Sequence, residues 1–329
     1  MRNTRVVLFS LILSAIFSYA LLYSTLELPV LLNELFAEFT PHYGAGDWNE
    51  AEKFVESVRP LGYLSLGATV ILIVLGFALG KYKLSLLGSA SLLLPTFSYF
   101  ASVMFFLSGI GFLRIIWLPI IELSPGSSIY EKISAASNIL ELGDIAYLPY
   151  DFLRIVLSPF DGKHLDETLF KTIVFAASIL FFSSCATWFY ARFKGKGFAD
   201  MLVYNYSRHP QYLSFLVWSY GLLVYDKYVF TPPKGGFFAP PPLLWVTTAL
   251  IIIGVALREE KDMLRKHGLK YADYRFRTPF MLPLTRPVAR MLKTPVKLFF
   301  KKDYPENTIE IAVTLTFYGL ILLVLSALY

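Results

Sequence analysis

The chain has 329 residues, of which 56% are hydrophobic and 16% are charged, and its mean hydropathy is +0.55. Soluble domains rarely reach such values, so the composition indicates an integral membrane protein. A single cysteine excludes disulfides and cysteine-based metal sites. None of the four histidines has metal-ligand spacing, so no metal is expected. The net charge of +6 does not predict nucleic-acid binding, because the basic residues flank apolar segments.

Seven apolar segments are candidate membrane spans, since roughly 20 apolar residues cross the hydrocarbon. The sequence therefore predicts an all-α fold, a polytopic membrane helical bundle with about seven transmembrane helices. Segment 106–121 is also apolar, and whether it and 138–160 span or re-enter the membrane stays open. The seven predicted spans are 6–26, 61–79, 84–107, 169–190, 211–229, 243–257 and 309–329.

Lysine and arginine residues orient these spans. With a cytoplasmic N-terminus, the cytoplasmic segments hold 21 of the 30 Lys and Arg residues, as the positive-inside rule requires. We therefore expect a cell-membrane protein whose segments 191–210 and 258–308 face the cytoplasm. The first span is expected to be an uncleaved anchor, because its 21 residues exceed the apolar core of a signal peptide.

The outer segment 27–60 is expected to form two short helices. The first carries an apolar stripe and should lie on the bilayer surface, and the second should open with the capping pair Asp47 and Glu50. Further along, Asp144, Asp151 and Arg154 stand in an apolar stretch and are expected to pair with one another. The stripe consists of Leu28, Leu31, Leu32, Leu35, Phe36 and Phe39.

Segment 284–302 is basic and amphipathic. Its lysines and arginines alternate with apolar residues, which suits a helix lying on an anionic cytoplasmic leaflet. We expect anionic lipids of this leaflet to be partners of the segment, which would anchor and orient the protein.

The sequence Arg208-His209-Pro210-Gln211-Tyr212 stands where a basic turn meets the fifth predicted span. Pro210 suits the first turn of a helix, because its missing N–H removes no hydrogen bond there. The unpaired N–H groups of that turn, together with Arg208 and His209, would attract a carboxylate or phosphate. The alternative is an ordinary basic flank of a membrane helix.

Glu259 and Glu260 follow the sixth predicted span without a helix breaker, so they should lie one turn beyond the bilayer. There they could accept hydrogen bonds from ribose hydroxyls or balance a cation, or they could form a solvated helix face. Gly268 is expected to end this helix as its C′ residue.

Tyr271 and Tyr274 lie three residues apart on one predicted helical face, before Arg277 and the helix stop Thr278-Pro279. Tyrosines at this depth are usually interfacial belt residues. With Arg277 beside them they could instead line a cofactor pocket, and spacing alone leaves both interpretations open.

Residues 207–283 resemble the C-terminal core of the isoprenylcysteine carboxyl methyltransferase and phospholipid methyltransferase superfamily. The resemblance rests on the order and spacing of short motifs and covers about a quarter of the chain. It divides the chain into an N-terminal membrane region, 1–165, a methyltransferase-like core, 166–283, and a basic segment with the final span, 284–329. The matching residues are Arg208, His209, Pro210, Tyr212, Glu259, Glu260, Gly268, Tyr271, Tyr274, Pro279 and Pro283.

Three positions depart from the family pattern. Ser214 stands where relatives have glycine, Met263 where they have leucine, and His267 where they have phenylalanine. The serine could narrow close helix packing, and the histidine adds a titratable group. None of the three removes a group that contacts the methyl donor in relatives.

The resemblance implies S-adenosylmethionine as the methyl donor, held in a non-Rossmann pocket at the cytoplasmic face, and a lipid or prenylated acceptor that enters from the bilayer. Glu260 would hold the polar end of the donor, and Arg277 or Arg208 would orient a carboxylate. A sulfonium methyl is already activated, so catalysis would consist chiefly of in-line alignment in a water-poor pocket. The implied catalytic residues are Arg277, Glu260 and Arg208, and the implied cofactor-binding residues are Arg208, His209, Pro210, Tyr212, Glu259, Glu260, Tyr271 and Tyr274.

The acceptor that this resemblance favours is an isoprenylcysteine-type carboxylate, which needs a positioning arginine but no base. A phospholipid amine would need a base, for which His209 and Glu260 are candidates. The same membrane core occurs in NADPH-dependent sterol and steroid reductases, whose second motif carries a cysteine that is absent here. A non-catalytic scaffold or a transporter is the remaining alternative, although no inverted repeat relates the two halves.

Overall fold

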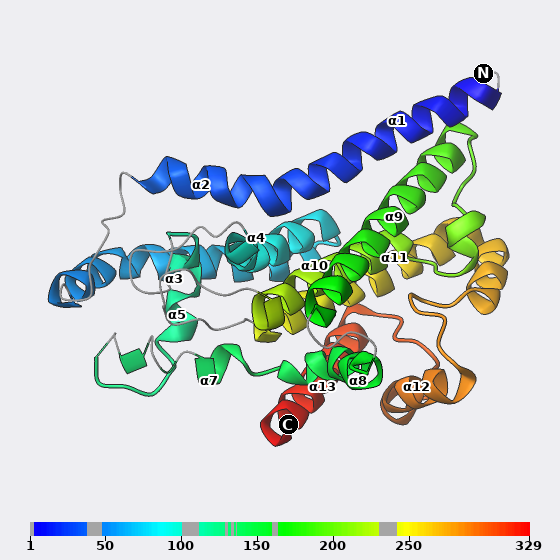
Figure 1. The fold of residues 1–329 in the computed structure, drawn as a ribbon. Coiled ribbons are helices and arrows are strands. Elements are labelled where there is room, and N and C mark those ends of the chain that lie inside the picture. The colour runs from blue at the N-terminus through cyan, green and yellow to red at the C-terminus, as the bar shows by residue number, and fades with distance from the viewer. Residues whose placement is uncertain are drawn as a thin grey trace. The chain divides into compact units, whose positions relative to one another are not determined.

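The computed structural model describes residues 3–37, 48–100, 112–128, 131–132, 135, 137–159, 164–229 and 242–329, and the regular elements of these residues are helices (Figure 1). The predicted all-α fold is therefore confirmed. The α-helices are α1 (Asn3–Leu22), α2 (Leu28–Ala37), α3 (Trp48–Ala78), α4 (Tyr82–Phe100), α5 (Leu118–Ile121), α7 (Ser137–Leu140), α8 (Leu148–Leu157), α9 (Leu165–Phe193), α10 (Pro210–Val224), α11 (Pro242–Arg277), α12 (Arg286–Phe300) and α13 (Thr308–Leu328). Two π-helices, η1 (Tyr23–Glu27) and η5 (Tyr225–Val229), and three 3-10 helices, η2 (Phe112–Trp117), η3 (Asp144–Tyr147) and η4 (Leu202–Asn205), complete the series.

Five helices among the described residues are long and apolar enough to cross a membrane. They match five of the seven predicted spans, and the chain is a helical membrane protein. Their bounds are Asn3–Glu27, Glu52–Ala78, Leu165–Phe193, Pro242–Arg277 and Thr308–Leu328.

The other two predicted spans, 84–107 and 211–229, correspond to α4 and to α10 with η5. Both segments are helical over their described residues, but they fall short of the apolarity of a span. Polar and charged side chains lower the mean hydropathy of both segments, namely Lys83 in α4 and Gln211, Asp226 and Lys227 in α10 with η5. The count of seven spans stays a prediction.

The outer segment 27–60 differs from its prediction. A first helix is present as α2, but the expected second short helix is continuous with the following span as α3, which runs for 31 residues. Pro60 lies inside this helix and does not end it. The predicted capping residue Asp47, and Phe39 of the apolar stripe, lie outside the described residues.

Segments 106–121 and 138–160, for which the sequence left open whether they span or re-enter the membrane, form no span in their described residues. Residues 112–121 form η2 and α5, and residues 106–111 lie outside the described residues. Segment 138–160 contains the end of α7, then η3 and α8, of which the longest has 10 residues. Helices of this length cannot cross the hydrocarbon.

The chain forms two compact units. The first consists of Met1–Leu22, Lys171–Gly221 and Ile252–Tyr318, and the second of Tyr23–Phe170, Leu222–Ile251 and Gly319–Tyr329. The division into segments 1–165, 166–283 and 284–329, which follows from the family resemblance, stays a prediction.

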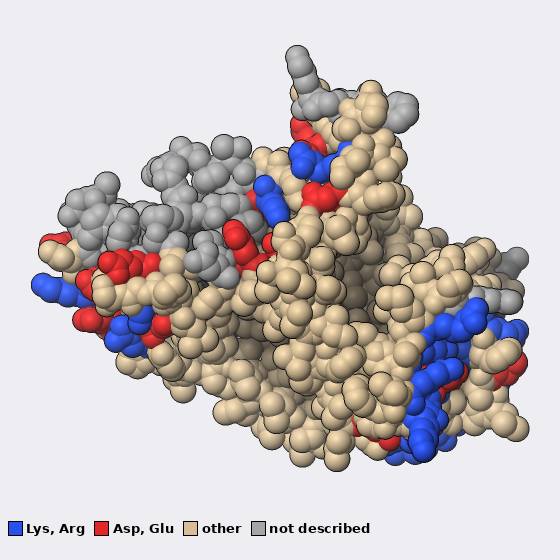
Figure 2. All heavy atoms as spheres, turned by 90° about the horizontal axis from the view of Figure 1, so that it is seen from below, with Lys and Arg blue, Asp and Glu red and all other residues tan. Residues whose placement is uncertain are grey.

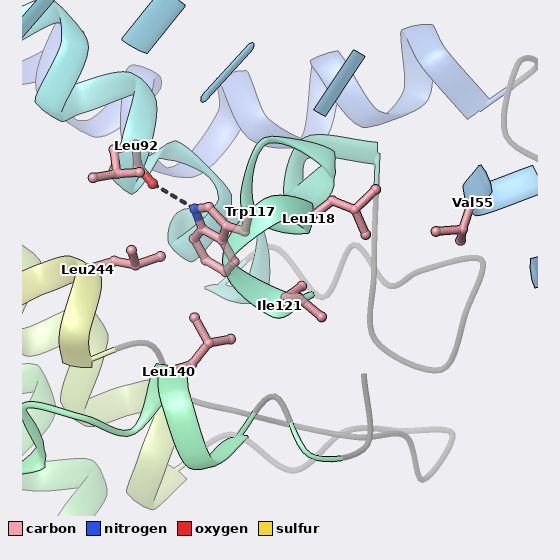
Figure 3. Packing of buried hydrophobic residues seen from close by; sticks show 7 residues of the cluster. All are labelled: Val55, Leu92, Trp117, Leu118, Ile121, Leu140 and Leu244. Atoms are coloured by element: carbon pink, nitrogen blue, oxygen red, sulfur yellow. Dashed lines mark hydrogen bonds between the residues drawn. The ribbon is translucent and has the colours of Figure 1, made fainter. Parts of the chain in front are cut away.

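Trp117 is at the centre of the core of the second unit (Figure 3). Its ring is fully buried, and its indole N–H donates to the carbonyl oxygen of Leu92 at 2.9 Å. A buried indole normally has such an acceptor. The surrounding buried side chains are Val55, Leu92, Leu118, Ile121, Leu140 and Leu244.

The predicted mutual pairing of Asp144, Asp151 and Arg154 is not what the second unit shows. Arg154 instead contacts Asp166, with Nε 2.7 Å from Oδ1. Asp151 accepts hydrogen bonds from the hydroxyls of Tyr228 and Tyr329 at 2.7 and 2.6 Å, and Asp144 accepts one from Ser326. The acidic side chains therefore tie together segments that are distant in the sequence.

Candidate functional site

The two motif stretches of the sequence meet within the first unit. α10 begins at Pro210, as predicted, and the preceding turn is held by Ser207, whose hydroxyl accepts from the His209 N–H at 3.3 Å. The backbone N–H of Arg208 donates to the carbonyl oxygen of Pro279 at 3.0 Å. This bond joins the turn before α10 to the segment that follows α11.

Glu260 lies at the centre of a buried ionic cluster, which we call the Glu260 cluster (Arg208, His209, Glu260 and Arg275). Arg208 Nη1 is 3.0 Å and His209 Nε2 is 3.3 Å from Glu260 Oε1, and Arg275 Nε is 3.0 Å from Oε2. Glu260 is 1% exposed, and Arg208 and His209 are 4% and 8% exposed. A carboxylate buried so deeply is stable only with charged partners, and both of its oxygens have them.

The arginine contacts of this cluster are ionic and lack hydrogen-bond geometry. Arg208 Nε and Nη1 and Arg275 Nε make no hydrogen bond to any described residue. Both arginines therefore keep N–H groups that can donate to another acceptor.

Glu259 has a different environment from its neighbour. The hydroxyl of Tyr212 donates to Glu259 Oε1 at 2.7 Å, and His209 Nδ1 lies 4.0 Å from Oε2. The rings of His209 and Tyr212 are stacked with centroids 5.8 Å apart. The Glu259 side chain is 38% exposed, against 2% for Glu260, so Glu259 is the carboxylate that a ligand can reach.

Gly268 ends the helix that carries Glu259 and Glu260, as predicted, and a second helix follows at once across a kink, so the range Pro242–Arg277 of α11 contains two helices. Gly268 has φ of 53° and ψ of −132°, a conformation that essentially only glycine adopts. The helix resumes at once, and the change of direction places Tyr271 and Tyr274 in the protein interior, 3% and 5% exposed. They are therefore packed residues and not an exposed interfacial belt.

Phe198 packs against the aromatic side chains on both sides of this kink. Its ring lies 5.3 Å from those of His267, Tyr271 and Tyr274, and the hydroxyl of Tyr274 donates to the carbonyl oxygen of Tyr204 at 2.7 Å. A Cβ atom at Gly197 would come within 2.5 Å of the His267 ring. His267, which departs from the family pattern, therefore packs closely against Gly197.

Ser214 also departs from the family pattern, and it is accommodated without a clash. Its side chain is buried, and its hydroxyl donates to the carbonyl oxygen of Gln211 at 2.8 Å. The same Gln211 donates from Nε2 to the thiol sulfur of buried Cys185.

Arg277 is not brought to the Glu260 cluster. Its guanidinium pairs with Asp273 at 2.7 Å, and both side chains are more than 60% exposed. Arg275, which the sequence motifs did not single out, is the arginine of this segment that contacts Glu260. Tyr271 and Arg275 are four residues apart and share a helical face once α11 resumes, so helical periodicity could have identified it.

Two aromatic residues beyond the recognised motifs also contact the cluster. Phe280 lies against the His209 ring, with centroids 5.1 Å apart. Tyr304 lies between α12 and α13, and its ring centroid is 4.1 Å from the guanidinium carbon of Arg275. Its neighbour Asp303 pairs with Lys297, and this hydrogen bond lowers the pKa of the Asp303 carboxyl. No motif in the sequence indicates Tyr304, because its contacts are long-range.

Comparison with known proteins gives one distant relative. Methanethiol S-methyltransferase 1 of Bradyrhizobium diazoefficiens is 31% identical over 93 residues, which are 28% of this chain and 28% of the relative. A distant relative is thus a methyltransferase. The match spans less than a third of the relative's length, and it supports the expected superfamily loosely. No family model and no solved structure matches the chain.

Proposed function

We propose that this protein is a membrane methyltransferase that uses S-adenosylmethionine to methylate an acceptor from the bilayer. The observation that carries the proposal is the contact between His209 and Glu260, 51 residues apart. These residues belong to the two motifs on which the resemblance rests, and the only chemistry that the distant relative's name states is methyl transfer.

The residues of this site suit the methyl donor. Glu259 is an accessible carboxylate that can accept from hydroxyl or ammonium groups, and Arg208 and Arg275 keep donors for a carboxylate. Glu260, enclosed by Arg208, His209 and Arg275, would position these three side chains beside the donor. This positioning role adds to the role that the resemblance implied for Glu260, which is to hold the polar end of the donor.

Methyl transfer forms one bond to the sulfonium methyl and breaks the bond between this methyl and sulfur. The protein contributes alignment and exclusion of water. A carboxylate acceptor, of the isoprenylcysteine type, needs no deprotonation, and an arginine with spare donors can hold it. This is the acceptor that we propose first.

A thiol is the second candidate acceptor, since the relative's name states methylation of methanethiol. A thiol must lose its proton before it attacks. His209 is the candidate base, because its ring lies between Glu259 and Glu260, with Nδ1 4.0 Å from Glu259 Oε2 and Nε2 3.3 Å from Glu260 Oε1.

Methyl-labelled donor distinguishes these acceptors. Membranes that contain the protein would be incubated with S-adenosylmethionine labelled in its methyl group, and the labelled product would be treated with alkali. A methyl ester releases labelled methanol, whereas a thioether or a methylated amine keeps its label. Absence of any labelled product above membranes that lack the protein would refute the proposed function.

A binding experiment separates the methyltransferase from a reductase of the same membrane core. S-adenosylhomocysteine should raise the melting temperature of the detergent-solubilised protein, and NADPH should not. The His209→Ala variant should weaken the binding of S-adenosylhomocysteine by about 1–3 kcal/mol, as for loss of a charged hydrogen-bond partner. Stabilisation by NADPH alone would favour the reductase.

We further propose that the site faces the cytoplasm, that α4 and α10 complete a bundle of seven spans, and that α12 lies on an anionic leaflet. Figure 2 shows Lys and Arg side chains gathered at the right of the view, over α12. Met291 and Leu298 of the same helix are 75% and 74% exposed. Exposed apolar side chains beside lysines suit the boundary between acyl chains and anionic head groups.

A further inference from the structure

Tyr304 lies outside the segment that resembles a known family, yet three cations surround its ring. The guanidinium carbon of Arg275 is 4.1 Å, the Nζ atom of Lys293 is 4.4 Å and the guanidinium carbon of Arg208 is 5.4 Å from the ring centroid. The Tyr304 hydroxyl accepts from Arg208 Nη2 at 3.4 Å. An aromatic face attracts cations through its quadrupole, so this ring keeps three positive groups close together.

Positive charge exceeds negative charge around this ring. Glu260 is shared by Arg208, His209 and Arg275. Asp303 is shared by Lys293 at 3.9 Å and Lys297 at 3.0 Å. Two carboxylates thus neutralise four lysine and arginine side chains only in part, and an additional anion would be attracted here.

The hydrogen-bonding capacity of the two arginines points to the same place. Arg208 has a side chain that is 0% exposed, and its Nε and Nη1 groups make no hydrogen bond to the described residues. Buried donors of this kind normally have an acceptor. A carboxylate would satisfy an arginine through two parallel hydrogen bonds.

The turn that carries Tyr304 is firmly held. Lys302 Nζ contacts Glu306 at 2.8 Å and Glu310 at 3.1 Å, and the backbone N–H of Glu306 donates to Glu310 Oε2 at 2.6 Å. These contacts fix the start of α13 against the turn. The ring of Tyr304 is therefore preorganised beside the arginines, which reduces the entropy lost on binding a ligand.

We propose that Lys293 and Tyr304 complete, with Arg208 and Arg275, an anion subsite that takes the carboxylate of the methyl donor's amino-acid portion. This inference rests on the proposed function and deepens it. Lys293 belongs to α12, so a basic helix outside the methyltransferase-like core contributes directly to the affinity for the donor.

Two ligands that differ in the amino-acid portion test the subsite. S-adenosylhomocysteine carries this carboxylate, and 5′-methylthioadenosine lacks it. Their dissociation constants would be measured by calorimetry on the solubilised full-length protein, the Lys293→Met variant and the Arg265→Met variant. Arg265→Met is the matched control, because it removes one positive charge from a side chain that is 79% exposed and pairs only with Asp262 among the described residues.

Lys293→Met should weaken binding of S-adenosylhomocysteine about tenfold, the effect of losing a charged partner, and should leave binding of 5′-methylthioadenosine unchanged. Lys293→Arg, which keeps the charge, should restore most of the affinity. Arg265→Met should change neither ligand. Equal weakening of both ligands, or no weakening of either, would overturn the subsite. A wild-type protein that binds neither ligand would instead refute the proposed function.

Discussion

At the scale of single residues, the adjacent glutamates Glu259 and Glu260 have different environments. Glu260 is enclosed by Arg208, His209 and Arg275, whereas Glu259 has one tyrosine hydroxyl and an open side. Sequence reasoning could place both carboxylates near the site but not distinguish them, because the distinction depends on Arg275 and on burial.

Substitution of the two glutamates should separate structure from binding. Glu260→Gln leaves two arginines without their countercharge and should lower the free energy of unfolding by about 3 kcal/mol. Glu259→Gln keeps an acceptor for the Tyr212 hydroxyl and should change the free energy of unfolding by less than about 1 kcal/mol. The same variant should weaken the binding of S-adenosylhomocysteine. Thermal denaturation and calorimetry would measure these two effects, and equal destabilisation by both variants would contradict the assignment.

The two arginines near the end of α11 provide a second test. Arg277→Ala removes an exposed pair with Asp273 and should change stability by less than about 1 kcal/mol. Arg275→Met removes a partner of Glu260 and should weaken the binding of S-adenosylhomocysteine about tenfold. Calorimetry on both variants would decide, and a larger effect at Arg277 would restore the role that the motifs implied for it.

At the scale of elements, the kink in α11 explains why the site was predictable only in part. The sequence predicted a helix that leaves the bilayer with Glu259 and Glu260 and a break at Gly268, and both features are present. It did not predict how the second helix of α11 is directed after the kink, because a glycine at a helix end looks the same in sequence as a glycine between two helices. The position of Arg275 depends on the helix that follows.

Gly268→Ala should therefore affect the site at a distance. The left-handed backbone at this residue costs about 1–3 kcal/mol for a residue with a side chain, although a Cβ atom would meet nothing within 4 Å. The variant should melt at a lower temperature and bind S-adenosylhomocysteine more weakly. Gly67→Ala, at a position that is also open but without positive φ, is the matched control and should do neither.

At the scale of the whole molecule, apolar run length and basic flanks sufficed to predict an all-α membrane protein. The two spans that lack confirmation, α4 and α10, contain buried serines, as do α1, α9 and α13, and composition alone cannot say whether a polar residue faces lipid or protein. The contacts of Asp144, Asp151 and Arg154 were mispredicted for a related reason. Their partners Ser326, Tyr329 and Asp166 are set by tertiary packing.

The predicted orientation can be tested with introduced cysteines, because the native Cys185 is buried. Lys196→Cys should react with a membrane-impermeant maleimide in inverted membrane vesicles and not in intact cells. Ser158→Cys, in a segment predicted to face outward, should show the reverse pattern. The wild-type protein gives the background, and labelling of Lys196→Cys in intact cells would invert the topology.

The hydrogen bond from the Arg208 backbone to the Pro279 carbonyl has an evolutionary consequence. Every amino acid except proline has a backbone N–H, and all have a carbonyl oxygen, so substitutions of the surrounding side chains can leave this hydrogen bond in place. A lineage could exchange the side chains of the site while the turn before α10 and the segment after α11 stay joined. Divergence of the side chains on an unchanged backbone would leave only short, separated motifs in common. Residues 207–283 show this kind of similarity.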